Sequence, residues 1–386
     1  MPVNIPQPAT TIAMKENNLG EIAKVFLRLG ITGFGGPAVH IAMMEEEVVR
    51  KRKWLTHEHF IDLIGATNLI PGPNSTEMAL HCGHMRGGWR GLLIAGACFI
   101  LPAVIITALF AWAYQQYGSL PQVAPFIYGI KPAIIGIIIS LMITLGKKAL
   151  KSIELILTCF VCVILAIFGI NEIYVLFGAG LAGMLIYSIK QKVQNLNTIL
   201  PVSMLSVTII STHRSNWKVF WIFLKIGSIL YGSGYVLFAF LNTELVKTGM
   251  LSRQTLIDAI AVGQFTPGPV FSSATFIGWQ MNGLQGAVAA TIGIFLPSFL
   301  FVALLNPLVS RLRKSKLMSA FLDMVNVASI ALIIAVCVDL GKSSITSWKT
   351  IIIAITGLAV TLIFKKLNSA FVILGGSVLG YLLLLF

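Results

Sequence analysis

Long apolar segments recur along almost the whole of this chain, and they restrict its fold more than any other feature. About ten such segments, each of about twenty residues, are long enough to cross a bilayer core of about 30 Å. Only 11% of the residues are charged, whereas a soluble domain carries about 25%. No long polar stretch leaves room for a soluble catalytic domain. We therefore predict an all-α polytopic membrane protein.

The formal net charge is +14, which in a soluble protein would suggest nucleic-acid binding. Here the basic residues lie in short loops, as the positive-inside rule requires, so no nucleic-acid partner is expected. The sequence has no GxxxxGK[ST] nucleotide-binding motif. It also lacks a nucleophile and base that can be placed together. We therefore expect a protein that is not an enzyme.

Two cysteine and histidine patterns are candidates for a metal site. Cys159 and Cys162 form a CxxC inside an apolar segment, and His81, Cys82 and His84 lie near a predicted helix end. No carboxylate or second cysteine pair completes a tetrahedral ligand set at either place. We predict neither a metal site nor a cofactor.

The chain contains an internal repeat. Matched segments keep their order, and their spacing changes only from 197 residues (Phe26 to Phe223) to 195 (Pro102 to Pro297). Pro71-Gly72-Pro73 returns as Pro267-Gly268-Pro269. We predict an N-terminal tail and two repeats joined by a basic linker: 1–20, 21–189, 190–218 and 219–386.

The loop charges indicate that the two repeats have opposite topology. A basic turn, 50–53, follows the first apolar segment, but its counterpart has only Lys247 and Arg253. The uncharged turn 115–122 corresponds instead to a basic one, 311–316. Such a swap is expected for inverted repeats. Opposite topology needs an odd number of crossings per half. Each half has six apolar segments, so we predict that the PGP segment is re-entrant and that about ten helices cross.

Each PGP sequence should break a helix inside the membrane. Proline removes a backbone donor and clashes with the preceding turn. Unpaired backbone groups at membrane depth must be buried in protein or line a wet cavity. In transporters with inverted repeats, such broken helices bind substrate, and their N-termini face anions. A single PGP could be a packing kink, but two at matching positions favour a binding site.

The substrate-binding candidates at these breaks are the PGP backbones and the neighbouring hydroxyl and amide groups: Asn68, Pro71, Gly72, Pro73, Asn74, Ser75, Thr76, Gln264, Pro267, Gly268, Pro269, Ser272 and Ser273. The glycine clusters around Gly35, Gly36 and Gly232 form a second matched pair of breaks. Close packing of helices explains these glycines equally well.

Three cations at membrane depth suggest an anionic substrate, because intramembrane charges are costly and usually functional. Arg28 and Lys225 occupy the same repeat position, whereas Lys131 corresponds to Asn326. Arg28 and Lys225 could instead extend to the membrane interface. The acids Asp62, Glu77 and Asp258 either carry coupling protons or pair with these cations.

Four segments resemble the chromate ion transporter family in its two-domain long form: Phe34-Gly35-Gly36-Pro37, Ile70-Pro71-Gly72-Pro73, Thr266-Pro267-Gly268-Pro269 and Gly293-Ile294-Phe295-Leu296-Pro297-Ser298. The resemblance covers nearly the whole chain. It implies export of chromate, a sulfate-like oxyanion, across the inner membrane of a prokaryote, driven by the membrane or proton gradient.

The chain departs from the family pattern at a few positions. Tyr231-Gly232-Ser233-Gly234-Tyr235 replaces a Phe-Gly-Gly-Gly-Tyr type of motif, and Asn68 and Glu77 stand where glutamines are expected. Glu77 would alter the anion preference or add a protonation site. The alternatives left open are a sulfate or other small-anion transporter or exchanger, and an anion channel. The many small residues would also allow a homodimer.

Overall fold

The computed structural model describes residues 18–34, 36–118, 120, 124–191, 216–231, 234, 236–313, 315–364 and 367–385. These residues form helices and short connections without any strand, which confirms the all-α prediction. Most of the predicted tail 1–20 and linker 190–218 lies outside the described residues, as do Gly35 and Gly232.

The same order of elements occurs twice. The first repeat contains α1 (Leu19–Thr32), α2 (Pro37–Met44), η1 (Glu45–Lys51), α3 (His57–Thr67), α4 (Asn74–Tyr117), α5 (Ala124–Ala149), α6 (Ile153–Ile167) and α7 (Glu172–Gln191). The second contains α8 (Asn216–Ile229), α9 (Val236–Leu241), η3 (Asn242–Val246), α10 (Arg253–Phe265), η4 (Val270–Ser272), α11 (Ser273–Arg313), α12 (Lys316–Ser344), α13 (Trp348–Ile363) and α14 (Ser369–Leu385).

Matched hydroxyl caps start the helices that lead into the two PGP breaks. The side chain of Thr56 accepts a hydrogen bond from the backbone N–H of His59 at the start of α3. Ser252 accepts from Thr255 in the same way at the start of α10. Such caps satisfy N–H groups that have no partner inside the helix. The two helices therefore begin at equivalent places and reach the prolines after a similar length.

The first repeat begins with a helical hairpin. Glu21 at the start of α1 pairs with Arg52, just beyond η1, at 3.4 Å. Further along, Arg28 pairs with Glu47 at 3.6 Å. These contacts hold α1 and α2–η1 side by side in opposite directions. The structure thus adds a second hairpin to the one that the PGP sequence predicts.

The long helix after each PGP break folds back on itself. Its backbone leaves the helical region at Gly88 (φ 57°, ψ −146°) in α4 and at Gly283 (φ 60°, ψ −151°) in α11. A Cβ atom on Gly83 would meet the Gly91 carbonyl oxygen across this turn. The first part of α4, residues 74–86, therefore lies against 89–117, and it also packs on α3. The PGP segment is a hairpin, as predicted.

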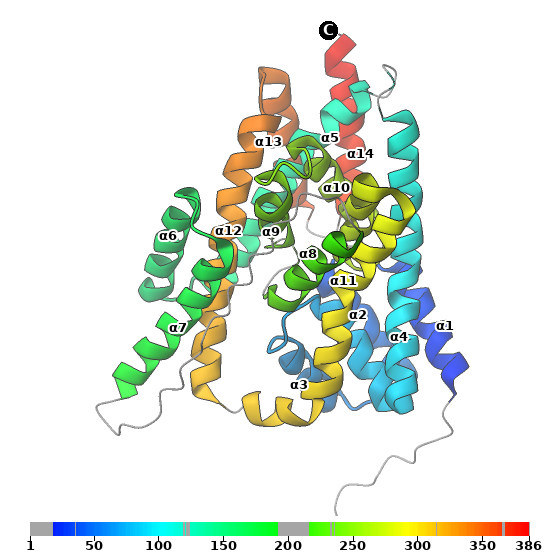
Figure 1. The fold of residues 1–386 in the computed structure, drawn as a ribbon, viewed down its shortest axis with the longest axis vertical. Coiled ribbons are helices and arrows are strands. Elements are labelled where there is room, and N and C mark those ends of the chain that lie inside the picture. The colour runs from blue at the N-terminus through cyan, green and yellow to red at the C-terminus, as the bar shows by residue number, and fades with distance from the viewer. Residues whose placement is uncertain are drawn as a thin grey trace, which may run out of the picture.

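The two repeats are inverted relative to each other. Figure 1 shows α3 near the lower end of the molecule and α10 toward the upper end. The long part of α4 rises from the lower end, whereas α11 descends from the upper end to the turn before α12. α4 and α11 pack together where the repeats meet. This antiparallel arrangement agrees with the swap in loop charge.

The repeats also exchange helices. α5 of the first repeat packs against α13 and α14 of the second, and α12 of the second packs against α6 and α7 of the first. Small residues permit the first contact, since Gly129 on α5 lies directly against Gly376 and Gly380 on α14. Each side bundle therefore contains one helix from one repeat and two from the other.

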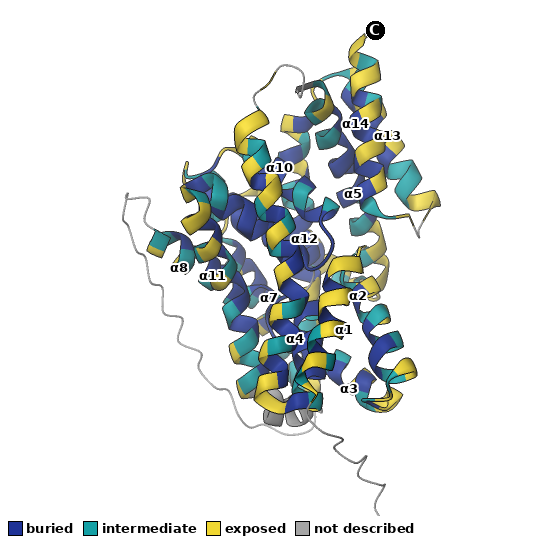
Figure 2. Cartoon of the chain, turned by 90° about the vertical axis from the view of Figure 1, so that its right-hand side faces the viewer, coloured by how far each residue is buried: buried dark blue, intermediate teal, exposed yellow. Residues whose placement is uncertain are grey.

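Large apolar side chains cover the outside of the molecule. On α4 they include Trp89, Leu93, Ile105 and Leu109, and on α11 the corresponding face carries Leu284, Val288, Leu300 and Leu304. Figure 2 shows exposed residues on the outer faces of the helices and buried residues where helices meet. Such large exposed apolar surface requires contact with lipid.

The lengths of the helices fit this assignment. Five described helices are long and apolar enough to cross a membrane, and four more apolar helices are shorter. The chain is a polytopic membrane protein built from two inverted repeats.

We expect Gly129→Ala to destabilise the folded protein, because its Cβ would meet the Gly376 carbonyl oxygen and the backbone of Gly380. Overpacking of this kind costs about 1–3 kcal/mol. Gly341→Ala on α12 is the matched control, since nothing lies within 4 Å of its Cβ position. Thermal unfolding in detergent should show a lower midpoint for Gly129→Ala alone. Equal midpoints for the two variants would contradict the close α5–α14 packing.

Candidate functional site

The predicted helix breaks contact one another in two pairs, each joining a PGP sequence of one repeat to the start of the glycine motif of the other. The backbone N–H of Gly72 donates to the carbonyl of Leu230, with an N–O distance of 2.8 Å. The backbone N–H of Gly268 donates to the carbonyl of Gly33 at 2.7 Å. Leu230 stands in the second repeat where Gly33 stands in the first. The two hydrogen bonds are therefore equivalent, and each PGP glycine is held by the glycine break of the other repeat.

Only glycine fits these two positions. Gly72 has φ 140° and Gly268 has φ 92°, backbone conformations that side chains make unfavourable. A Cβ on Gly72 would also meet Glu77 and Ser298, and one on Gly268 would lie 3.0 Å from the Ala103 side chain. The glycines thus let two backbones approach within hydrogen-bonding distance at the repeat interface.

The first PGP break holds a buried carboxyl group. Glu77, on the first turn of α4, is fully buried. The hydroxyl of Ser298 on α11 donates to its Oε1 at 3.5 Å. Its Oε2 and the hydroxyl of neighbouring Thr76 have no hydrogen-bond partner within the described chain. The phenol of Tyr231, next to Leu230, lies within electrostatic range of Glu77.

The second PGP break holds a cluster of hydroxyl groups instead. Thr107 of α4 donates to Ser272 at 3.2 Å and to Thr266 at 3.4 Å. All three side chains are buried, and Ser273 beside them has a buried hydroxyl without a hydrogen-bond partner among the described residues. This cluster offers hydroxyl donors at the junction of the two repeats, where the first break offers a carboxyl.

A second buried acid lies on α10, the helix that leads into the second PGP break. Asp258 is 5% exposed and accepts hydrogen bonds from the Tyr114 hydroxyl at 2.7 Å and from Gln254 Nε2 at 3.0 Å. Tyr114 belongs to α4, so this contact also joins the repeats. Lys131 of α5 is half-buried and lies within electrostatic range of Asp258. Lys131 is thus a cation whose neighbour is an acid already held by two other donors.

The structure brings most of the predicted binding residues together. The residues at the two breaks that are buried are Pro71, Gly72, Pro73, Ser75, Thr76, Gln264, Pro267, Gly268, Pro269, Ser272 and Ser273. Gly36, with φ 82°, directly precedes α2 as its N-cap residue. Their role in substrate binding stays a prediction.

The other candidates are at least partly exposed or form ion pairs, and two of them, Asn68 and Asn74, flank the first break. Arg28 and Lys225 have side chains 63% and 43% exposed, and they pair with the repeat-matched acids Glu47 and Glu244. Asn68 is exposed and accepts a hydrogen bond from Asn74 at 2.9 Å, and Asp62 is also exposed. The ion pairs with Glu47 and Glu244 give Arg28 and Lys225 a structural role that requires no ligand.

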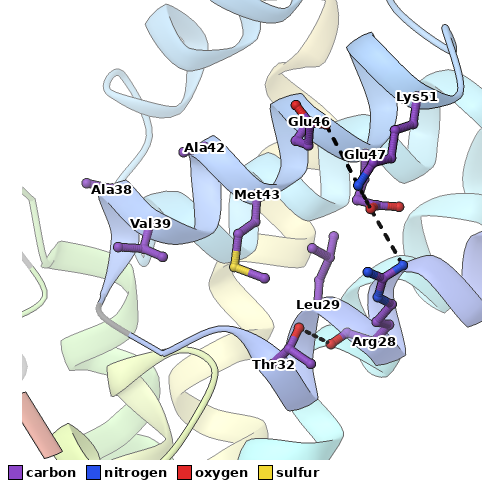
Figure 3. Close-up of a pocket in the computed structure, with 10 residues that line it drawn as sticks. All are labelled: Arg28, Leu29, Thr32, Ala38, Val39, Ala42, Met43, Glu46, Glu47 and Lys51. Carbon is purple, nitrogen blue, oxygen red and sulfur yellow. Dashed lines mark hydrogen bonds and ion pairs between the residues drawn. The ribbon is translucent and has the colours of Figure 1, made fainter. Parts of the chain in front are cut away.

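A cavity of about 500 Å³ lies beside the first glycine break, between α1 and α2–η1. Figure 3 shows Leu29, Val39 and Met43 along its apolar part and four charged side chains at the other end. Two of these are cations, Arg28 and Lys51, and two are the acids Glu46 and Glu47. Because the charges balance in ion pairs, this cavity has no excess positive charge for an anion.

Sequence reasoning missed several side chains at the breaks. Thr107, Tyr114 and Ser298 come from long apolar helices, where single polar residues give no periodic pattern. His40 was also missed: its ring lies 2.8 Å from the Gly33 carbonyl, to which Nε2–H donates, so that this oxygen accepts from both His40 and Gly268. For Ser298 a signal existed, since it follows the repeat-matched Pro297 and corresponds to Ala103.

The sequence comparisons agree with this arrangement. The family model described as Chromate transporter matches residues 20–184 and again residues 217–381. The chromate transport protein of Cupriavidus metallidurans is 30% identical over 98% of both chains. The probable chromate transport protein of Synechococcus elongatus is 28% identical, over 94% of this chain and 95% of the relative.

The chromate transport protein of Pseudomonas aeruginosa is 27% identical, over 92% of this chain and 90% of its own. No solved structure matches the chain. These relatives are named as transport proteins, and the family model covers both repeats. The chain therefore belongs to the chromate transporter family.

Proposed function

We propose that this protein is a secondary active transporter that exports chromate, a sulfate-like oxyanion, across the cytoplasmic membrane of a prokaryote. The membrane or proton gradient would drive it, since the sequence has no nucleotide-binding motif. The observation that carries the proposal is the reciprocal pair of hydrogen bonds between the PGP breaks and the glycine breaks. The family and its named relatives support the choice of chromate.

The substrate would bind at these paired breaks. In the structure the Gly72 and Gly268 N–H groups donate to carbonyl oxygens of the opposite repeat. An oxyanion presents acceptor oxygens of the same kind with additional negative charge, and charge-assisted hydrogen bonds are stronger than neutral ones. Chromate would therefore compete with the carbonyls, with further donors from Thr76, Ser272 and Ser273.

Lys131 would supply the positive charge. It is the one of the three predicted cations that is not held in an ion pair with a repeat-matched glutamate, and its neighbour Asp258 already accepts from Tyr114 and Gln254. The carboxyl of Asp258 would remain hydrogen-bonded while Lys131 turns toward an arriving anion. These two hydrogen bonds would reduce the free-energy cost of leaving the buried Asp258 carboxylate without its cation.

The exchange of helices limits how access can alternate. Since α5 is packed between helices of the second repeat, and α12 between those of the first, one repeat cannot move as a rigid body against the other. The moving units would be the two side bundles against the central pair α4 and α11. The central hydrogen bonds would open and close as these bundles tilt.

Purified protein in proteoliposomes should take up chromate saturably under an imposed proton gradient, because both the gradient and a finite number of sites limit the flux. Dissipating the gradient should collapse the accumulation, and sulfate should compete. If sulfate flux is saturable and chromate flux is absent, the substrate is sulfate and not chromate. A flux that neither saturates nor depends on the gradient would indicate an anion channel.

We expect Lys131→Met to abolish or strongly reduce chromate transport while the protein still reaches the membrane, because the anion loses the cation proposed to bind it. Lys148→Met is the matched control, since Lys148 lies on the same helix and is exposed. Initial uptake rates per reconstituted protein provide the measurement. Wild-type uptake rates in Lys131→Met would contradict the proposed role of Lys131 in anion binding.

A further inference from the structure

A row of buried titratable side chains on α4 has no role in anion binding as described. Glu77, His81 and His84 are spaced four and three residues apart, so they lie on one face of the helix within reach of their neighbours. Glu77 and His81 are both 0% exposed, whereas His84 is half-buried. The row therefore leads from the first PGP break toward the turn at Gly88.

α3 contributes one more histidine to this row. His59, near the start of α3, is half-buried, and both His59 and His84 lie within electrostatic range of His81. The start of α3 follows the basic turn 50–53. The outer end of the row thus opens on the membrane side that carries this turn, which the positive-inside rule assigns to the cytoplasm.

Four buried polar atoms of the row lack a hydrogen-bond partner in the part of the chain that the structure describes. Both ring nitrogens of His81, Oε2 of Glu77 and Nε2 of His59 have no hydrogen-bond partner within the described ranges. Buried polar atoms in native proteins are nearly always hydrogen-bonded, so a cluster of unsatisfied ones requires an explanation. Groups that pick up and release protons need such unoccupied positions.

The second repeat has no equivalent row. Counting from the matched pair Gly83 and Gly278, His81 corresponds to Phe276 and His84 to Trp279. Glu77 falls on the serines 272–273, and His59 on Thr255. A role in packing would be expected in both repeats, since their backbones are equivalent. The restriction to one repeat instead suggests a task that the transporter performs on one side only.

Groups from several elements surround the row. Ser298 of α11 and Tyr231 after α8 lie near Glu77, and Asp62 is exposed on α3. On α4 itself, Cys82 is buried, and Arg86 pairs with Glu21 at 3.6 Å and lies over the Trp54 ring. The Arg86 guanidinium therefore contacts α1 and Trp54.

We infer that Glu77, His81, His84 and His59 form the path by which the coupling proton moves between the anion site and the cytoplasmic side. When the anion site is open to the outside, hydronium protonates the Glu77 carboxylate; when it is open to the cytoplasm, Glu77 gives this proton to His81, which passes it to His84 or His59 and then to cytoplasmic water. No electrons are exchanged. The inference rests on the proposed proton-driven transport, because it names the group that carries the proton.

The test compares two kinds of flux in proteoliposomes containing the full chain. Exchange of labelled for unlabelled chromate needs no gradient, whereas accumulation under a pH gradient requires proton coupling. An entrapped pH dye records the protons that move with chromate. The variants are Glu77→Gln, His81→Phe, which copies Phe276, and the control His57→Gln, since His57 is exposed at the start of α3 and pairs with Glu45.

We expect Glu77→Gln to retain exchange and to lose both gradient-driven accumulation and chromate-linked proton movement. His81→Phe should retain exchange but slow the proton movement, and His57→Gln should match the wild type. Wild-type coupling in both Glu77→Gln and His81→Phe would overturn the path while leaving chromate transport intact. If Glu77→Gln does not fold, the result for His81→Phe decides alone.

An infrared titration separates failure of the path from failure of the proposed function. If wild-type protein moves no chromate in either assay, the transport proposal fails. The path then predicts a buried carboxyl band that responds to bulk pH, is absent in Glu77→Gln and responds more slowly in His81→Phe. A band that does not respond to pH, or that is unchanged in both variants, would overturn the path.

Discussion

Two backbone hydrogen bonds at the centre of the molecule determine much of the remaining structure. Each joins a PGP glycine of one repeat to the carbonyl at the glycine break of the other. Helix breaks inside a membrane leave polar backbone groups that lipid cannot satisfy. By pairing the breaks across the repeats, the fold satisfies these groups and fixes α4 and α11 side by side. The positive φ values of Gly72 and Gly268 follow from this geometry.

The two PGP breaks have equivalent backbone hydrogen bonds but different side chains. At the first, Glu77 faces Ser298, and at the second, Thr107 faces Ser272 and Thr266. In the proposed mechanism, an acid on one side and hydroxyls on the other would let one pseudosymmetric scaffold hold a proton and an anion at neighbouring places. Duplication thus accounts for the scaffold, and later divergence of single side chains accounts for the specific chemistry.

The repeat, the inversion and the positions of the breaks could be predicted because each appears in the sequence as a pair of matched local patterns, such as the two PGP sequences. The partners of those breaks could not, since the Gly72–Leu230 contact joins residues far apart in the chain. For Arg28 and Lys225 the sequence left two roles open, substrate binding and a position at the membrane interface. Glu47 and Glu244 match across the repeats as well, and the structure pairs each cation with its own acid. Thr107 and Ser298 gave no periodic signal.

The exchange of helices between repeats has a consequence for how the protein is made. α5 ends at Ala149, but its partner α14 begins only at Ser369, so at about 5–20 residues per second the ribosome needs roughly 10–45 s to supply it. During that interval the glycine face of α5 around Gly129 has only lipid or the insertion machinery to cover it. Newly inserted chains would therefore be most vulnerable to membrane proteases before synthesis of the last helix, and folding of the first repeat would be completed by the second.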